Sequence, residues 1–462
     1  MLEKFLNIFR IPDLRKRVLF TLAILAVYRL GAHIPTPGVN GHQLEMIFNQ
    51  QSGSALGLMD LFGGGNLRRM TVFALGIMPY ITASIIFQLL TVVYEPLARI
   101  QKEGELGRRK ITQWTRYMTV VLGALQSIGI AAILTRTPGL VLNPGLSFSL
   151  MTVLTLTTGT AFIMWLGEQI TDRGIGNGMS LLIFAGIVAG LPRAVAELYN
   201  KIQTQAWGQL TFLVVLLLIA VMAAVVAFIV FVERSERRIP IQSARRIVGR
   251  RMMGGQSSHL PLKVNAGGVM PVIFASSILS APMLFSQVEW VQNSRFLQPI
   301  LAAMAPGMPW YVLLNMLGII FFAYFYISIV MKPDDIADNF RKSGSFIPGI
   351  RPGKRTSDFI NDILTRLTLV GALYLIAITL VPTFMISGIR FDKLFLIGRV
   401  FEAMPTWVTH GMGVNFYFGG TSLLIVVGVA MDTVNQIESQ LIMRHYDGFS
   451  PRSGRIRGRK TW

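Results

Sequence analysis

The chain contains no cysteine and very little charge. Only 14% of its 462 residues are Asp, Glu, Lys or Arg, whereas a typical soluble domain has about 25%. The lack of cysteine excludes disulfides, thiolate metal sites, iron–sulfur clusters and a cysteine nucleophile. The 5 histidines are scattered, without the helical spacing of metal ligands. We therefore expect neither a metal site nor a cofactor.

Enzyme motifs are also missing. The sequence has no His-Glu-x-x-His, no Gly-x-Ser-x-Gly and no paired membrane-embedded aspartates. The glycine-rich run Gly174–Gly178 is not followed by Lys-Ser or Lys-Thr, which indicates a tight turn between helices rather than a phosphate-binding loop. Few ionisable residues fall within apolar stretches, which argues against a proton- or sodium-coupled carrier. The chain is predicted not to be an enzyme and to have no catalytic residues, and a secondary transporter of a small solute is kept as the alternative.

Apolar residues are what the chain has in abundance: 52% of it is hydrophobic, and its mean hydropathy is +0.54. A bilayer core of roughly 30 Å needs about 20 mostly apolar residues in a helix. Ten stretches fit this requirement, and they are Val18–Ile34, Thr71–Val93, Tyr117–Leu134, Phe148–Gly167, Met179–Val195, Leu210–Val232, Ala266–Phe285, Pro309–Met331, Leu367–Ile386 and Phe416–Ile437.

The lysines and arginines are distributed very unevenly between these stretches. With ten spans, the two termini and every second loop lie on one side of the membrane, and that side carries 33 of the 43 Lys and Arg residues. The positive-inside bias therefore predicts that both termini are cytoplasmic. Three cytoplasmic loops are long and basic: 94–116, 233–265 and 332–366. Their charge fits an anionic partner such as lipid headgroups, ribosomal RNA or an acidic protein surface.

Two further segments are membrane-associated without spanning. Leu2, Phe5, Leu6 and Phe9 fall at helical spacing, which is typical of an amphipathic helix on the membrane surface, with a disordered tail as the alternative. Between the first two spans, residues 56–70 contain a short apolar stretch, three glycines and a basic pair. This segment is too short to cross a bilayer and is predicted to be re-entrant.

Six motifs, spread along the chain, carry a family resemblance. They are Phe73–Ile81, Gly104–Lys110, Gly167–Thr171 with its glycine-rich continuation, Leu260–Asn265, Phe346–Gly353 and Phe416–Ser422. In this order they resemble the bacterial SecY family, the channel subunits of the Sec protein translocase. The resemblance runs essentially from end to end.

The resemblance implies an all-α polytopic membrane protein with ten transmembrane helices in two pseudo-symmetric five-helix halves and a short re-entrant plug helix. The implied divisions are a cytoplasmic N-terminus (1–17), a first half (18–200) with the plug (56–69), a second half (201–437) with the loops 233–265 and 332–366, and a basic cytoplasmic tail (438–462).

The resemblance also assigns roles to individual residues. A ring of aliphatic side chains at the pore waist would consist of Ile77, Ile81, Met179, Ile183, Ile273 and Ile425, with Met179 standing where isoleucine is commoner. The plug would include Leu58, Leu61, Phe62, Gly63, Gly64 and Gly65. A polar cluster at a lateral gate would consist of Gln88, Gln126 and Asn265. Binding of SecA or the ribosome would use Arg250, Arg251 and Arg351.

The function implied is a protein-conducting channel. It would pass unfolded polypeptides across the bacterial plasma (inner) membrane and release hydrophobic segments laterally into it. The implied partners are the SecE and SecG subunits, the SecA ATPase, the ribosome, membrane lipids, and secretory and membrane polypeptides with signal sequences.

Overall fold

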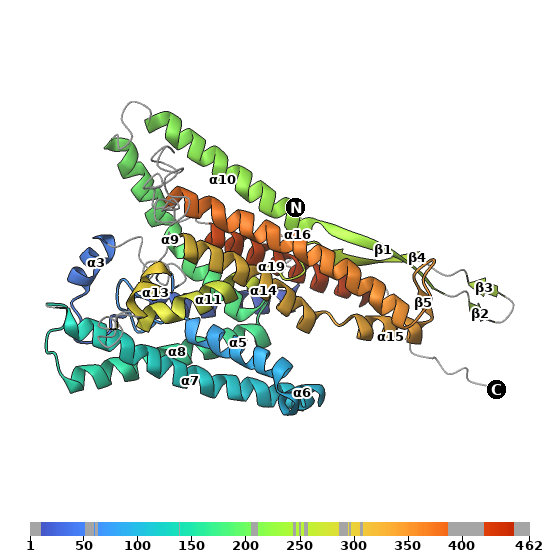
Figure 1. The fold of residues 1–462 in the computed structure, drawn as a ribbon, viewed down its shortest axis with the longest axis horizontal. Coiled ribbons are helices and arrows are strands. Elements are labelled where there is room, and N and C mark those ends of the chain that lie inside the picture. The colour runs from blue at the N-terminus through green and yellow to red at the C-terminus, as the bar shows by residue number, and fades with distance from the viewer. Residues whose placement is uncertain are drawn as a thin grey trace, which may run out of the picture.

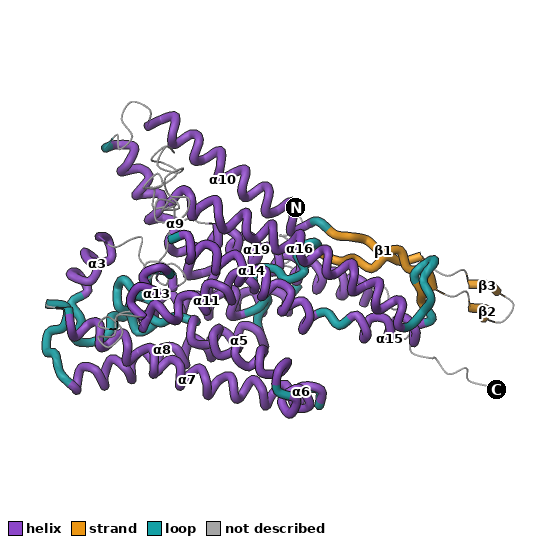
Figure 2. Tube along the Cα trace, viewed as in Figure 1, coloured by secondary structure: helices purple, strands orange, loops and turns teal. Residues whose placement is uncertain are grey.

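The computed structural model is a bundle of long helices from which a β-ribbon projects at one end (Figures 1 and 2). It describes residues 11–50, 60, 63–137, 139–204, 211–243, 246–248, 251–253, 257–285, 294, 297–304, 308–386 and 420–447. The predicted surface helix at residues 2–9 lies outside this part of the chain.

Each of the ten predicted spans contains a helix. These helices are α2 (Pro12–Gly31), α5 (Met78–Val93), α7 (Glu105–Arg136), α8 (Leu146–Arg173), α9 (Gly178–Gln203), α10 (Thr211–Arg234), α11 (Met270–Phe285), α14 (Pro309–Val330), α16 (Lys354–Ile386) and α19 (Gly420–Asp447). Four shorter helices are α3 (Gly41–Gln50), α6 (Glu95–Lys102), α13 (Leu297–Ala303) and α15 (Pro333–Ser343).

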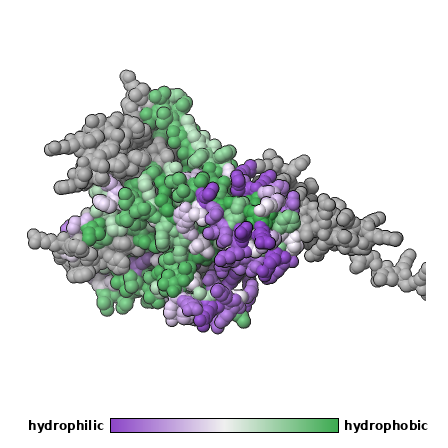
Figure 3. Space-filling model, turned by 45° about the vertical axis from the view of Figure 1, so that its right-hand side comes forward, coloured by the Kyte–Doolittle hydropathy of each residue, from purple (hydrophilic) through white to green (hydrophobic). Residues whose placement is uncertain are grey.

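The membrane character of the bundle is visible in its surface. Six helices of the described chain are long and apolar enough to cross a membrane, and the bent pair α5–α6 would add a seventh. The remaining helices are shorter or more charged. Large apolar side chains are exposed on helices that could face lipid. Phe212 and Phe231 of α10, for example, are 78% and 71% exposed. Figure 3 shows this hydrophobic surface bordered by a hydrophilic region. Apolar patches of this extent require a membrane or a partner.

Several helix boundaries differ from the predicted ones, and α5 and α16 show the physical reasons. The second span was expected from Thr71, but α5 begins at Met78 because residues 71–77 form turns, with Gly76 at φ +58°. The last predicted span but one was expected from Leu367, whereas α16 starts at Lys354. Hydropathy detects only the apolar part of a helix, and the polar start of α16 packs in a separate small core.

That small core supports β-strands, which the all-α expectation did not include. Loop 233–265 contains β1 (Glu236–Ser243), β2 (Arg246–Val248), β3 (Arg251–Met253) and β4 (Ser257–Lys263), and β5 (Ser345–Phe346) follows α15. β1 pairs antiparallel with β4, bringing Ile239 opposite Leu260, and also with β5; β2 pairs with β3. Ile239 and Leu262 pack with Ile360 and Leu364 of α16. The alternating Ile239 and Ile241 of β1, both buried, are the sequence signal for this strand.

The helices form two groups that meet along a few contacts. Helices α2, α5, α7, α8 and α9 contact one another, as do α10, α11, α14, α16 and α19. Between the groups, α5 and α7 contact α11, while α9 contacts α10 and α19. The three long basic loops, which contain α6, the β-ribbon and α15, lie at the same end of the molecule (Figure 1).

Candidate functional site

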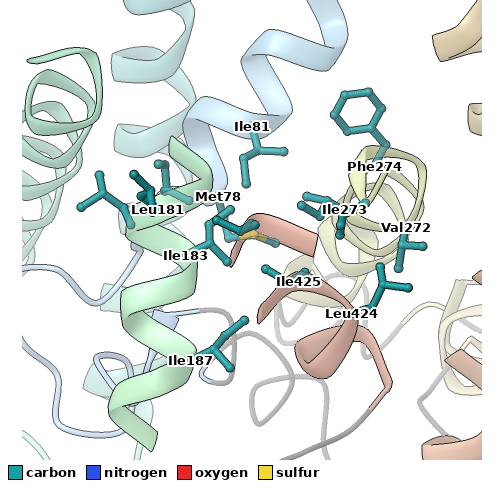
Figure 4. Close-up of a cluster of buried hydrophobic side chains, with 14 of the residues drawn as sticks. Met78, Ile81, Leu181, Ile183, Ile187, Val272, Ile273, Phe274, Leu424 and Ile425 are labelled. Carbon is teal, nitrogen blue, oxygen red and sulfur yellow. The ribbon is translucent and has the colours of Figure 1, made fainter. Parts of the chain in front are cut away.

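Five isoleucines from four helices meet in one apolar cluster. Ile77 is the residue before α5, Ile81 lies on α5, Ile183 on α9, Ile273 on α11 and Ile425 on α19. All five are buried and belong to the same hydrophobic core. Figure 4 shows Ile81, Ile183, Ile273 and Ile425 directed into the space between these helices. The structure thus brings together the residues that the resemblance assigns to a pore ring.

The sixth expected ring residue, Met179, is placed differently. It is half-buried and packs against the same core, but its sulfur lies against Gly167 of α8, where an added Cβ would overlap it. Methionine is long and flexible enough to fill such a gap between helices. Met179 therefore links the isoleucine cluster to α8.

The start of α9 is fixed by side-chain capping. The Oδ1 of Asn177 accepts hydrogen bonds from the backbone N–H groups of Met179 at 3.1 Å and Ser180 at 3.4 Å. The hydroxyl of Thr171, at the end of α8, accepts the N–H of Gly178 at 2.9 Å. Capping satisfies N–H groups that the helix itself leaves free. As predicted, the glycine-rich run is a turn between two helices, and it sets the register of Ile183.

The plug segment is described only in part. Leu58, Leu61 and Phe62 lie outside the described residues, whereas Gly63, Gly64 and Gly65 are described. Gly64 and Gly65 have φ values of +71° and +84°. A Cβ on Gly64 would lie 2.6 Å from the backbone of Gly186 on α9. Position 64 therefore requires glycine both for its conformation and for its close approach to α9.

The end of the plug segment is built into the protein body. The Nδ2 of Asn66, which is 1% exposed, donates to the hydroxyl of Tyr28 on α2 at 3.3 Å. Leu67 and Met70 are buried in a second core together with Leu44 of α3. The part of the plug segment from residue 66 onward is therefore packed rather than free to swing out.

The three expected lateral-gate residues are not joined by hydrogen bonds in the described structure. Gln88, on α5, donates to Ser84 at 3.3 Å, and Gln126 lies on α7. Asn265 donates to the carboxylate of Glu233 at 2.7 Å and to the carbonyl of Gly268 at 3.1 Å. Asn265 thus connects the end of α10 to the segment that leads into α11.

Sequence reasoning missed this partner of Asn265. Glu233 is the last carboxylate before the β-ribbon, and a second pair lies nearby, between Lys263 and Asp432 of α19 at 3.6 Å. From the sequence, Glu233 and Lys263 fall at the two ends of the basic loop 233–265, and Asp432 falls late in the last predicted span. The sequence does not show which of these charged residues lie close together, because their positions depend on how the strands of the β-ribbon pair.

Two of the three expected docking arginines, Arg251 and Arg351, are among the described residues, and both lie in the long basic loops. Arg351 is exposed in the turn between β5 and α16, where its carbonyl accepts the hydroxyl of Thr356 at 3.0 Å. Arg251 is the first residue of β3 and pairs with Val248. Arg250 lies outside the described residues. β5, which shortly precedes this turn, and the β-ribbon lie at the same end of the molecule (Figure 1).

The side chains of the isoleucine cluster can exclude water and ions, but they offer no reactive group. Its five isoleucines offer no hydrogen-bonding group, and within the described ranges no group of three or more His, Cys, Asp or Glu residues could hold a metal ion. A pore constricted by such side chains would block ions and water by dewetting.

Comparison with known proteins decides the family. The SecY family model matches residues 71–434. The chain belongs to the SecY family. It is 49% identical over 441 residues to protein translocase subunit SecY of Escherichia coli, covering 94% of this chain and 93% of that protein.

Solved structures with the SecY-type fold agree with the bundle. One, described as showing that the SecY plug domain stabilises the closed state of the translocation channel, has a TM-score of 0.66 at 16% identity and 95% coverage of both chains. Sec61 in a canine ribosome–channel complex has a TM-score of 0.61 at 13% identity, again with 95% coverage of both. At this identity the likeness shows the fold. Family and fold together make this chain a multi-pass membrane protein.

Proposed function

We propose that the chain is the pore-forming subunit of a protein translocase, which passes unfolded polypeptides across a membrane and releases hydrophobic segments into it. The observation that carries the proposal is the meeting of Ile81, Ile183, Ile273 and Ile425 from four helices in one cluster, in a chain 49% identical to a translocase subunit. The reading as a small-solute transporter finds no support. The family assigns the chain to transport rather than catalysis, so it is not an enzyme.

The isoleucine cluster acts as the closed waist of the pore. Aliphatic side chains form a seal that widens around an arriving polypeptide when the helices separate. Because isoleucine makes no hydrogen bond, the waist imposes no sequence requirement on the passing chain. In our proposal Met179, whose sulfur packs against Gly167 of α8, lies at the edge of the ring where α9 meets α8. In this proposal only the packing of apolar side chains holds the waist closed. A separate segment therefore has to stabilise the closed state.

The plug segment supplies that closure. The related SecY structure has a plug domain described as stabilising the closed state and maintaining a membrane seal. Gly64 of this chain contacts α9, the helix that carries Ile183, and this contact supports the proposed position of the segment near the waist. In our proposal the plug segment prevents leakage while no polypeptide occupies the pore.

Lateral release would occur between α5 and α11, which contact each other across the two helix groups. These groups correspond to the proposed halves 18–200 and 201–437. Gln88 on α5, Gln126 on α7 and Asn265 before α11 line the proposed gate region without a bond joining all three. A hydrophobic signal sequence would open the gate by replacing helix–helix contacts with its own, a shift of population by differential binding.

The hydrophilic end is the proposed docking face for the driving machine. Arg250, Arg251 and Arg351 suit RNA phosphates and acidic protein surfaces through bidentate contacts. The canine relative forms a ribosome–channel complex, and SecA is the second candidate. SecE and SecG are the proposed membrane partners, and the exposed apolar faces of the bundle contact lipid. We place the protein in the bacterial inner membrane with both termini in the cytoplasm.

Site-specific cross-linking tests the proposed pore. Because the chain lacks cysteine, Ile77→Cys or Ile273→Cys introduces one thiol, which should cross-link to a cysteine in a polypeptide stalled during translocation. Leu217→Cys, on the lipid-exposed face of α10, is the matched control and should not react. Absence of cross-links from every isoleucine of the cluster, with stalling shown independently, would reject the pore.

A further inference from the structure

A buried asparagine lies where the β-ribbon returns to the helix bundle. Asn265 is 4% exposed and follows β4, five residues before the first residue of α11. Its Nδ2 donates to the Oε1 of Glu233 at 2.7 Å and to the carbonyl of Gly268 at 3.1 Å. Hydrogen bonds to a carboxylate are stronger than those between neutral groups. The end of α10 is therefore firmly joined to the turn that leads into α11.

Asn265 also closes that turn through its backbone. Its carbonyl accepts the N–H of Gly268 at 3.2 Å, and Gly268 has a φ of +57°. The N–H groups of Val272 and Ile273 then bond to the carbonyl of Val269, at 3.2 Å and 3.3 Å. Hydrogen bonds thus run from the turn into the first turn of α11, so a shift of Asn265 would move the beginning of this helix.

A second helix encloses the turn. Gly371 of α16 lies so close that a Cβ there would be 3.0 Å from the carbonyl oxygen of Val264 and 3.6 Å from the Oδ1 of Asn265. The N–H of Val264 donates to the carbonyl of Ser235 at 3.0 Å. Because α10 is bonded to this segment and α16 packs against it, Asn265 has a defined position relative to both helices.

The helix that begins at this turn lies at the boundary between the two helix groups. α11 contacts α14 of its own group and α5 and α7 of the other. Ile273, in the first turn of α11, is 5% exposed and packs in the isoleucine cluster. Closely packed side chains do not tolerate displacement without loss of contact. The position of Asn265 therefore determines how well Ile273 fits the cluster.

We propose that Glu233 and Asn265 form an anchor that sets the position of α11, and with it the place of Ile273 in the proposed waist. Both are positioning residues, since they act on the waist through α11. Asn265 then serves the lateral gate by holding one of its helices, rather than by bonding to Gln88 or Gln126 across it. The inference rests on the proposed pore, to whose closed arrangement it assigns two further residues.

A neighbouring ion pair offers a comparison within the same region. Lys263 and Asp432 lie 3.6 Å apart, and their side chains are 43% and 62% exposed. An exposed pair of this kind contributes little. Breaking the bond of buried Asn265, in contrast, leaves polar groups without a partner away from bulk water. Removing one interaction or the other therefore separates the effect of the anchor from that of local charge.

Resting conductance in planar bilayers tests the anchor. Asn265→Ala should raise the leak in the absence of a translocating chain roughly tenfold, as expected for loss of a hydrogen bond to a charged group. Glu233→Ala should also raise it, and the double variant should leak no more than Asn265→Ala, because both changes remove the same bond. Glu233→Gln keeps an oxygen that accepts from Asn265 and should stay nearly closed. Asp432→Asn is the matched control and should behave as the unmodified protein.

Cross-linking reports the position of α11 directly. Figure 4 shows Ile273 and Ile425 directed into the same space, and the chain has no cysteine of its own. A short bismaleimide should join Ile273→Cys to Ile425→Cys in membranes, and should do so several times more slowly when Asn265→Ala is added. A variant that is only less stable would melt earlier while its folded fraction kept the original cross-linking rate.

Three outcomes overturn the anchor. One is unchanged conductance and cross-linking in both Asn265→Ala and Glu233→Ala. Another is an equal leak from Asp432→Asn, and the third is a leak from Glu233→Gln as large as that from Glu233→Ala. If Asn265→Ala does not accumulate in the membrane, Glu233→Ala decides the matter, because it changes a side chain that is only half-buried.

Failure of the proposed pore would look different from failure of the anchor. If Ile273→Cys and Ile425→Cys are not joined in the otherwise unmodified chain, and Ile273→Cys does not react with a stalled polypeptide, the pore itself is wrong. If both reactions occur and the anchor variants leave them unchanged, the pore is retained and the anchor is rejected.

Discussion

At the scale of single residues, the chain combines a permissive waist with strict positions around it. The isoleucines of the waist can exchange for other aliphatic residues of similar volume, because the seal depends on apolarity and fit. Gly64 and Asp60 have no such freedom. Gly64 is fixed by its backbone conformation and its contact with α9, and Asp60 is fixed by the hydrogen bonds it accepts. Constraint is concentrated in the closing segment.

Gly64→Ala should loosen closure. An alanine in the left-handed region costs roughly 1–2 kcal/mol, and its Cβ would meet the Gly186 backbone at 2.6 Å, adding overpacking of about 1–3 kcal/mol. We expect higher resting conductance in planar bilayers and a lower melting temperature in detergent. Gly65→Ala carries the same conformational strain at φ +84°, but no atom lies within 4 Å of its Cβ. It should therefore show the smaller effect, and equal effects would refute the contact.

At the scale of elements, the structure describes the expected plug 56–69 only at Asp60 and from Gly63 onward. Its later residues are buried: Asn66 bonds Tyr28 and Leu67 packs in the core around Met70. The sequence predicted a re-entrant segment from its short apolar run and glycines. The sequence could not show that the segment is buried from residue 66 onward, because burial of Asn66 depends on a tyrosine 38 positions away.

Replacing residues 56–62 by a glycine–serine linker of equal length should raise resting conductance while the protein still inserts; among the described contacts of residues 56–62, it loses those of Asp60. Extending the replacement through residue 69 removes buried Asn66 and Leu67, so it should also lower stability, by about 2–5 kcal/mol for the leucine alone. Conductance and thermal unfolding in detergent measure the two effects. Equal stability of the variants with residues 56–62 and 56–69 replaced would contradict the packing of Asn66 and Leu67.

At the scale of the whole molecule, the sequence predicted the helices well and the loops poorly. Each of the ten predicted apolar stretches overlaps a helix, and six helices of the described chain are long and apolar enough to cross a membrane, because the bilayer imposes a length and an apolarity that a local window detects. The β-ribbon was missed, since loop 233–265 was judged by its charge and length, not by the alternation of Ile239 and Ile241. The isoleucine cluster was reached only through the family motifs. The bond from Asn265 to Glu233 required the folded ribbon.

The predicted topology can be checked across the whole protein with single cysteines. Ser343→Cys in α15 and Ser147→Cys in α8 place exposed thiols at predicted opposite faces. A membrane-impermeant maleimide should label Ser343→Cys only in inverted vesicles and Ser147→Cys only in spheroplasts. Labelling of both positions from the same side would invalidate the ten-span alternation.

The long helix α16 has a mechanical consequence. Its 33 residues extend about 50 Å, from the small core beneath the β-ribbon to its contact with α19, which carries Ile425. An α-helix is stiff along its axis, so this one connects the hydrophilic end rigidly to the helix that carries one isoleucine of the proposed waist. A partner that tilts the ribbon would apply torque to α16 and shift α19 without touching the pore. A force applied to the β-ribbon could thus displace the helices of the proposed waist, without any ligand entering the membrane.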